Sequence, residues 1–430
     1  MQGVPVAFSH RVLIAVAVVC VGPFFSVLAQ ADPPPPGVAW LDVSGIDPIP
    51  LVQPRAFLEP ISDEPERHYL EVLGEAAFQA QKIFGTLARR SGLSCQACHI
   101  NGTVNPNLLI DGLSARPGGL DVTSSLFNAA ANDGVFNHRD VPSLRGIRAT
   151  APYGRAGRFP TLQAFTQHVI VDEFGGTQPS ARLLDALVAY QNRLQFGPNT
   201  RVAQGGELLS EGASKRGEAL FKRPFANRSE LSCAACHRPE RSFVDGKQHD
   251  VGTGATFDTP TLLGIAHTGP YFHDGATTSL TDVVAHFDRF FDLKLSSAEQ
   301  RDLVAYLEAI GAIDQAEMPV TLVGELEAID RLRWALGEAI KHQRFDDASL
   351  FVDVSRRRIG GLHARYSRDH QLQARQAMIV WSRALQGVGR KVEASDATDA
   401  RFAFLAYTSA FWEMTQTVIE TAAGARIKVR

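Results

Sequence analysis

Four of the five cysteines fall in two copies of one five-residue pattern, and this feature constrains the chain more than any other. The copies are Cys95-Gln96-Ala97-Cys98-His99 and Cys233-Ala234-Ala235-Cys236-His237. Two thiols three positions apart on a helical turn lie on nearly the same face. Both can therefore bond to one porphyrin, and the next residue can place its imidazole at the central iron. This C-x-x-C-H pattern is the attachment signature of c-type haem.

Two other interpretations of the cysteines were weighed, namely two short disulfide loops and a zinc site. A zinc site would use the cysteine pairs without needing a histidine directly after both. We therefore predict two covalently bound haem c groups. The predicted thioether residues are Cys95, Cys98, Cys233 and Cys236, and the predicted proximal iron ligands are His99 and His237.

The amino-terminal residues resemble a secretory signal. Arg11 precedes an apolar run, and Ala29-Gln30-Ala31 provides a small-residue cleavage site. We expect a signal peptide at residues 1–31, a Pro-rich linker at 32–64 and a periplasmic mature protein. An uncleaved membrane anchor is the alternative, but Gly22 and Pro23 interrupt the run. No later run is long enough to predict a transmembrane segment in the mature chain.

Composition predicts a globular protein and excludes some partners. The 430 residues are 45% hydrophobic and 21% charged, which is sufficient for a real core. The formal net charge of −3 shows no polybasic signal. We therefore expect no nucleic-acid partner and no anionic membrane surface as a partner.

An internal duplication organises the middle of the chain. Residues 140–168 and 258–286 align without gaps at an offset of 118. The two haem motifs are 138 residues apart, so the first copy holds about 20 extra residues between its motif and the aligned segment. We interpret these as an inserted loop beside the first haem. The predicted fold is mainly α, with two cytochrome c-like domains at residues 65–200 and 201–318.

The carboxy-terminal region at residues 319–430 shows a different pattern. Leu322, Leu326, Ile329, Leu336 and Ile340 form a helical stripe, and three more helix-like blocks follow. Four helices with short connections predict a helical bundle extension. Ser395 or Asp396 is the expected cap of the last helix. The extension has no cysteine or ligand cluster, so a packing or docking role is expected.

The duplicated pattern resembles the bacterial dihaem cytochrome c peroxidase family. It combines C-x-x-C-H, D-x-P-x-L-x-G-I, T-x-P-Y and H-D-G, and the second copy, DTPTLLGIAHTGPYFHDGATTSLTDVV, is close to the family pattern. This family also contains the dihaem enzyme that matures tryptophan tryptophylquinone. The resemblance implies exported two-domain proteins in which one haem reacts with peroxide and the other accepts electrons.

Two positions depart from the family pattern. The distal Met or Tyr of the C-terminal haem falls on Phe287, which cannot bind iron. The aromatic residue between the haems falls on Arg155. Both departures weaken the expectation of peroxidase chemistry and of long-range radical chemistry.

The duplication suggests distal ligands. His168 and His286 occupy matched positions, each six residues after a matched leucine. We hypothesise that they are distal iron ligands; the alternative is a solvent-facing helix histidine. Met318 is a less favoured ligand for the second haem. The polar groups considered as a catalytic acid or base are Gln167 and His138. Predicted haem-pocket residues are Tyr153, Tyr271, His273, Arg155 and Arg158.

The resemblance implies reduction of hydrogen peroxide. Electrons would come from a small donor protein, a cytochrome c or a cupredoxin, and would pass from the His237 haem to the His99 haem. The alternative is a non-catalytic dihaem electron carrier with closed bis-His haems. A third interpretation is a maturation enzyme that oxidises a partner protein, and the missing inter-haem aromatic argues against it.

Overall fold

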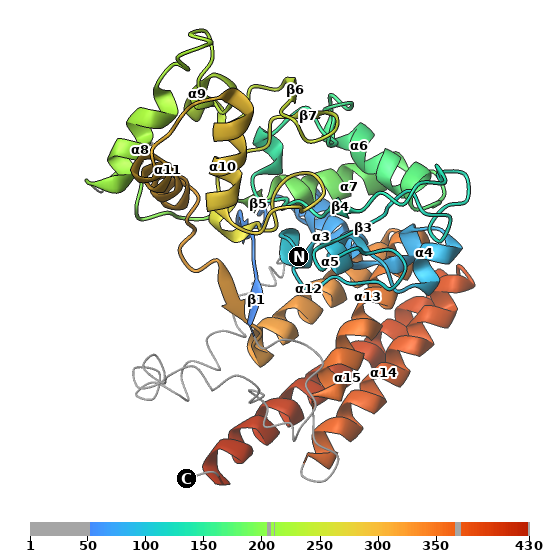
Figure 1. Ribbon diagram of the computed structural model, residues 1–430. Helices are drawn as coiled ribbons and strands as arrows, with labels where there is room; N and C mark the ends of the chain where they lie inside the picture. Colours follow the sequence, from blue (N-terminus) through green and yellow to red (C-terminus); the bar gives the residue numbers. More distant parts are fainter. Residues whose placement is uncertain (1–51, 204–207, 210, 366–370, 429–430) are drawn as a thin grey trace, which may run out of the picture.

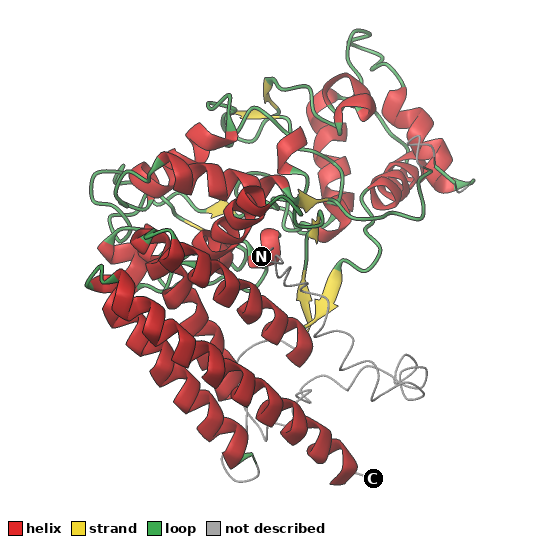
Figure 2. Ribbon diagram, turned by 180° about the vertical axis from the view of Figure 1, so that it is seen from behind, coloured by secondary structure: helices red, strands yellow, loops and turns green. Residues whose placement is uncertain are grey.

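The computed structural model describes residues 52–203, 208–209, 211–365 and 371–428, with side chains described as far as residue 421. The expected signal peptide and the linker residues before position 52 lie outside the described residues. The mainly helical fold is confirmed, and strands in the described part occur only as short antiparallel pairs (Figure 2). No helix among the described residues combines the length and apolar character needed to cross a membrane.

The first repeat is built on helices that precede and follow the first cysteine motif. Its elements are α3 (Pro65–Gln79), η1 (Gln81–Ile83), α4 (Thr86–Arg90), α5 (Cys95–Cys98), η2 (Ile100–Gly102), β3 (Gly119–Leu120), β4 (Arg139–Asp140), η3 (Ile147–Ala149), α6 (Leu162–His168), the π-helical turn η4 (Val169–Glu173), α7 (Ala181–Asn192) and β5 (Leu194–Gln195). Strand β3 pairs with β4.

The second repeat has matching helices in the same order, without a counterpart of α4 among its described residues. Its elements are α8 (Ala213–Lys222), α9 (Cys233–Cys236), η5 (Pro239–Arg241), β6 (Gln248–Asp250), β7 (Thr256–Asp258), η6 (Ile265–His267), α10 (Leu280–Phe291) and α11 (Ser297–Ile310). Figure 1 shows α8 to α11 as a group set to one side of α3 to α7. Strand β6 pairs with β7.

The same helix crossing supports both repeats. Helix α3 packs on α7, and α8 packs on α11. At each crossing a glycine lets two backbones touch, because a β-carbon on Gly74 would overlap the carbonyl of Ala186, and one on Gly217 would overlap the carbonyl of Asp302. The two crossings hold the helix before each cysteine motif against the last helix of its repeat.

Matched side chains also start the helices of the two repeats. Ser94 and Ser232 cap the short cysteine helices by accepting the backbone N–H three residues later. Thr161 caps α6 and its counterpart Ser279 caps α10 in the same way. Such caps satisfy backbone donors that a helix leaves free at its start. Local sequence therefore sets the helix starts around both motifs.

Residues 69–90, YLEVLGEAAFQAQKIFGTLARR, have a helix-like sequence that predicts one helix leading into the first cysteine motif, but the structure interrupts this helix. Helix α3 ends before Ala80, which has extended backbone angles. Gly85 then donates its N–H to the Phe174 carbonyl, and a β-carbon there would overlap the carbonyl of Gly175. A contact with a segment about ninety residues away breaks the helix, and local propensity could not reveal it.

Part of the expected linker is structured. Strand β1 (Val52–Pro54) pairs with β8 (Glu317–Pro319), and β2 (Phe57–Leu58) pairs with β5. Residues 52–58 therefore connect the first repeat to the segment that follows the second repeat.

The four expected carboxy-terminal helices are present as α12 (Leu322–Lys341), α13 (Phe345–Ala364), α14 (Leu372–Glu393) and α15 (Ala397–Lys428). Each contacts the next, and α12 also contacts α15. Asp396 starts the last helix by accepting the N–H of Asp399 at 2.9 Å, which settles the choice left open between Ser395 and Asp396.

The extension and the first repeat share one continuous hydrophobic core, whereas the second repeat has its own. Helices α12 and α13 lie against α3 (Figure 1). Buried Tyr69 donates to Asp347 at 2.8 Å, and Arg344 contacts Glu66 at 3.3 Å. Through these contacts the extension covers the outer face of α3.

Candidate functional site

Each cysteine pair lies on one short helical turn. The backbone N–H of His99 donates to the carbonyl of Cys95 at 2.7 Å, and that of His237 donates to the carbonyl of Cys233 at 2.9 Å. None of the four described cysteines forms a disulfide. Each turn therefore presents two free thiols and ends on a histidine.

The two motif histidines are oriented through one ring nitrogen. His99 Nδ1 donates to the carbonyl of Pro142 at 2.9 Å, and His237 Nδ1 donates to the carbonyl of Phe243 at 3.2 Å. Pro142 belongs to the first aligned segment, and the backbone of its counterpart Pro260 favours the protonated form of His237. A backbone acceptor on one nitrogen of a metal-binding histidine fixes the tautomer and leaves the other nitrogen for the metal.

Burial favours the neutral form of both imidazoles, which is the form that metal binding requires. Burial lowers the pKa of His99 to about 4, although the carbonyls of Pro142 and Thr103 oppose this. Burial also lowers the pKa of His237. A neutral imidazole with Nδ1 occupied offers the lone pair of Nε2.

The extra residues of the first repeat lie beside the first motif. Asn105 donates its side-chain N–H to the carbonyl of Ala97, inside the motif, at 2.8 Å. Arg116 reaches the second repeat and donates to the carbonyl of Gly275 at 2.6 Å. This insertion therefore bridges the first motif and the second repeat.

The repeats meet through reciprocal contacts. Asp140 donates its N–H to the carbonyl of His273 at 3.0 Å, and the matched Asp258 donates its N–H to the carbonyl of Arg155 at 2.9 Å. All four residues are related by the same offset of 118, so one surface patch pairs with its own duplicate. Such self-complementary pairing is typical of two-fold interfaces.

Several buried polar atoms near this interface have no partner within the described residues. They are His138 Nε2, Asp258 Oδ1, His273 Nδ1 and Arg145 Nη1. Orphaned buried polar groups are uncommon and indicate an unseen polar ligand or water. Haem propionates would supply acceptors for the nitrogen atoms of His138, His273 and Arg145, which fits haems beside these residues, whereas Asp258 Oδ1 would need a donor such as water.

The two matched helix histidines have different surroundings. His168 Nδ1 lies 2.8 Å from Asp172, its Nε2 lies 3.8 Å from Glu173, and its ring packs on Phe159. His286 Nε2 donates to the carbonyl of Val251 at 2.7 Å. Iron ligation through Nε2 of His286 would require this hydrogen bond to break. Distal ligation by both histidines stays a prediction.

Comparison with known families places the second repeat directly. Residues 213–330, which span α8 to the middle of α12, match the di-haem cytochrome c peroxidase family. The second repeat is therefore similar to this family. The methylamine utilization protein MauG of Methylorubrum extorquens is 33% identical over 173 residues, covering 32% of this chain and 47% of the relative. The chain thus spans about half the length of that relative.

Other relatives align over longer stretches at lower identity. MauG of Methylophilus methylotrophus is 25% identical and covers 55% of this chain and 81% of the relative. Hydrazine synthase subunit gamma of Kuenenia stuttgartiensis is 25% identical and covers 64% of this chain and 86% of the relative. The solved hydrazine synthase from that organism has a TM-score of 0.41 at 21% identity, covering 62% of this chain and 96% of the other. A MauG-like protein associated with microbial copper homeostasis has a TM-score of 0.40 at 17% identity, covering 62% and 95%.

Glu173 is a candidate site residue that sequence reasoning missed. It ends the π-helical turn after α6, where it faces His168, and burial raises its pKa. Arg158 and Arg155 lie close enough to oppose that rise. π-helical turns often mark functional positions. In the sequence, the only signal was the acidic pair Asp172-Glu173 directly after the helix.

Arg145 is a second missed residue. It is only 3% exposed, and it donates to the carbonyl of Arg55 at 2.9 and 3.0 Å without a carboxylate partner in the described region. Burial lowers its pKa to about 10. A buried cation that faces only carbonyls suits an anionic ligand group such as a propionate.

The remaining predicted pocket residues are placed as follows. Tyr271 donates its hydroxyl to the Ile265 carbonyl at 3.1 Å, and Tyr153 is buried against Phe165. Arg158 lies over the ring of Phe159, and His273 stacks on Phe257 with ring centroids 4.1 Å apart. Gln167 is half-buried on α6, and Met318 is 37% exposed in β8.

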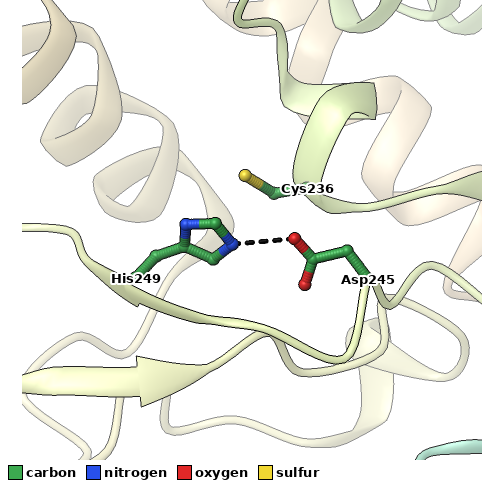
Figure 3. A group of neighbouring side chains, drawn as sticks. All are labelled: Cys236, Asp245 and His249. Carbon is green, nitrogen blue, oxygen red and sulfur yellow. Dashed lines mark hydrogen bonds and ion pairs between the residues drawn. The ribbon is translucent and has the colours of Figure 1, made fainter.

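Asp245 and His249 form a pair beside the second motif (Figure 3). Their carboxylate oxygen and Nε2 are 2.8 Å apart, and the Cys236 sulfur lies within 4.8 Å of both ligand atoms. A thioether at Cys236 would remove its thiolate, so this group does not compete as a metal site once haem is attached. The pair would then lie beside the thioether of Cys236.

Asp140 should make stability depend on pH. Burial raises its pKa to about 7, although Arg155 opposes this. A raised folded pKa stabilises the fold below the unfolded value near 4, and that contribution is lost as pH rises through about 7. In wild type, this titration should lower the free energy of unfolding by up to about 4 kcal/mol between pH 4 and 8. Asp140→Asn should abolish that decrease, as measured by urea unfolding across the same pH range. The exposed carboxyl variant Asp111→Asn should keep the wild-type slope.

Proposed function

We propose that this protein is an exported dihaem c-type cytochrome that reduces hydrogen peroxide with electrons from a small redox protein. One haem would be held by Cys95, Cys98 and His99, within residues 65–200. The other would be held by Cys233, Cys236 and His237, within residues 201–318. Residues 319–430 would form a helical extension that packs on the first of these domains. The segment 1–31 would direct export to the periplasm.

One observation carries this proposal. Both motif histidines donate Nδ1 to a backbone carbonyl and keep Nε2 free, next to two free thiols on the same turn. A disulfide or zinc site would not need a histidine oriented in this way at both motifs. Bound haem would supply the iron site and the one-electron storage that peroxide reduction needs.

Glu173 and His168 are proposed to move the protons. Reduction of one hydrogen peroxide to two water molecules consumes two electrons and two protons. The half-buried Glu173 carboxyl has a pKa raised by burial and lies 3.8 Å from His168 Nε2, so the pair is placed to pass a proton between the two groups. Gln167 and His138 remain the other proposed polar groups of this region.

The proposal is tested by peroxide consumption. The purified holoprotein, fully reduced with dithionite and freed of excess reductant, is expected to consume one hydrogen peroxide per two electrons. Free haem c peptide at equal iron concentration provides the background. Consumption at or below that background would contradict peroxidase function.

Glu173→Gln should impair peroxide reduction without preventing haem attachment. Loss of a positioned acid–base group typically lowers the rate about 10²-fold. The part of the pH–rate profile that reports the ionisation of Glu173 should also disappear. Stopped-flow decay of peroxide across pH 5 to 8 measures both effects. Asp185→Asn, a change at an exposed carboxyl on α7, should retain the wild-type rate and profile.

The matched histidines support one alternative, a closed electron carrier with His168 and His286 as distal ligands. That state predicts low-spin spectra for both haems in both oxidation states. The peroxidase proposal instead requires a high-spin or exchangeable site on at least one haem. Electron paramagnetic resonance of the oxidised and half-reduced protein separates the two.

A further inference from the structure

The second cysteine motif is more open to solvent than the first. Cys98 in α5 is buried, whereas α9 has no buried residue. Helices α12 and α13 cover α3 in the first repeat. On the equivalent helix α8, the outward residues Lys215, Arg216, Lys222 and Arg223 are exposed. The extension thus covers one repeat and leaves the corresponding side of the other accessible.

The accessible motif also lies in a basic part of an otherwise acidic chain. Residues 213–247 contain eight Lys or Arg and four Asp or Glu, a net +4, although the whole chain is −3. The matching stretch of the first repeat, residues 70–104, contains three basic and two acidic residues. Positive charge is therefore concentrated around the second motif.

The basic side chains border the haem-binding thiols. The charge of Arg223 acts on the Cys233 thiol, and the charge of Lys247 acts on the Cys236 thiol. Arg238 directly follows the proximal ligand His237 and is exposed. Cationic groups thus flank the motif from both ends.

Part of this charge is not neutralised locally. Arg223 pairs with Glu299, and Arg238 pairs with Glu240. In contrast, Arg228, Arg241 and Lys247 are exposed and form no ion pair within the described residues. These three uncompensated cations lie in the segments that flank the second motif in the sequence, and the field of each extends over roughly a Debye length, about 8 Å at physiological salt.

We propose that the surface formed by Arg228, Arg241 and Lys247 is the docking site of an electron-donor protein with an acidic face. This inference rests on the proposed function, because it requires a haem at Cys233, Cys236 and His237. Complementary charge raises the encounter rate and sets orientation more than it raises affinity. An acidic donor would thereby meet the chain at its exposed motif and away from the covered first repeat.

The experiment measures haem reduction by donors of opposite charge without any peroxide. Anionic iron(II)–EDTA and cationic hexaammineruthenium(II) serve as small probes, and a soluble cytochrome b5 domain serves as an acidic protein probe. Stopped-flow absorbance gives the second-order rate as a function of salt. Rates with both anionic donors should fall as salt rises, and the rate with the cationic donor should rise.

Charge reversal locates the effect. Arg228→Glu with Arg241→Glu should slow reduction by the cytochrome b5 domain roughly tenfold at low salt, and the neutral Gln pair should have an intermediate effect. The matched control is Arg383→Glu with Arg390→Glu, which reverses two exposed arginines on α14 and makes the same change in net charge. It should change the rate less than twofold.

If the Arg383 and Arg390 control variant slows haem reduction as much as the Arg228 and Arg241 variant does, the effect comes from net charge and the docking site is overturned. An unchanged reduction rate in the Arg228 and Arg241 variant would also overturn it. The same holds if salt changes the reduction rates with anionic and cationic donors in the same direction. Absence of covalent haem at the second motif would overturn both proposals. Charge-dependent reduction without peroxide consumption would retain the docking site and reject the peroxidase function.

Discussion

Replacing Cys233 and Cys236 together with alanine is expected to give a protein that carries one covalent haem instead of two. The two thiols lie on one turn of α9 and have no other covalent partner. Without them the porphyrin has no thioether anchor, and His237 alone cannot retain it through denaturation. Intact-mass spectrometry should show a loss of one haem mass, and the pyridine haemochrome signal per chain should halve.

The companion variants sharpen this result. Cys95→Ala with Cys98→Ala should also leave one haem, and the four-fold variant should leave none. Ser232→Ala removes only the hydroxyl that caps α9 at 3.1 Å from the Ala235 nitrogen, so it should retain both haems. Two covalent haems in either double-cysteine variant would refute the assignment of that motif.

Gly217→Ala is expected to destabilise the second repeat strongly. The new β-carbon would overlap the Asp302 carbonyl on α11, and both partners are helix backbone that cannot rotate away. Relief requires α8 and α11 to separate, which loosens the core around Phe221 and Tyr306. Overpacking of this kind costs about 3 kcal/mol, measurable as a lower urea midpoint.

Gly360→Ala provides the matched control for this change. Gly360 also lies inside a helix, α13, but it is exposed and has no neighbouring atom within 4 Å of an added β-carbon. Alanine is a better helix former than glycine by about 1 kcal/mol, so this variant should be neutral or slightly more stable. A similar loss in both variants would show that helical propensity, not the crossing, governs the effect.

Much of the helical framework could be predicted from local sequence. The stripe from Leu322 to Ile340 lies in α12, the three later helix-like blocks correspond to α13 to α15, and the expected cap of the last helix is Asp396. Amphipathic spacing and capping are short-range properties, so they survive folding unchanged. The prediction of one continuous helix over residues 69–90 was wrong for the opposite reason, because Gly85 hydrogen-bonds to Phe174, which is distant in the sequence.

The helix crossings also have a signal in the sequence. Residues 186–190 read ALVAY and residues 302–306 read DLVAY, and Gly-Glu-Ala occurs at 74–76 and 217–219. These short matches mark the two pairs of crossing helices. Their significance becomes visible only when the glycine of one helix is seen against the carbonyl of the other.

The sequence by itself determined the two cysteine turns and the repeat at an offset of 118, because covalent spacing within a helical turn and aligned residues require no knowledge of distant contacts. Only the tertiary structure decided how the repeats pair through Asp140, His273, Asp258 and Arg155, and that Glu173 faces His168. It also decided that the extension covers α3 while α8 and its basic surroundings stay exposed. These arrangements depend on which apolar faces find each other across the chain, and no local pattern encodes that choice.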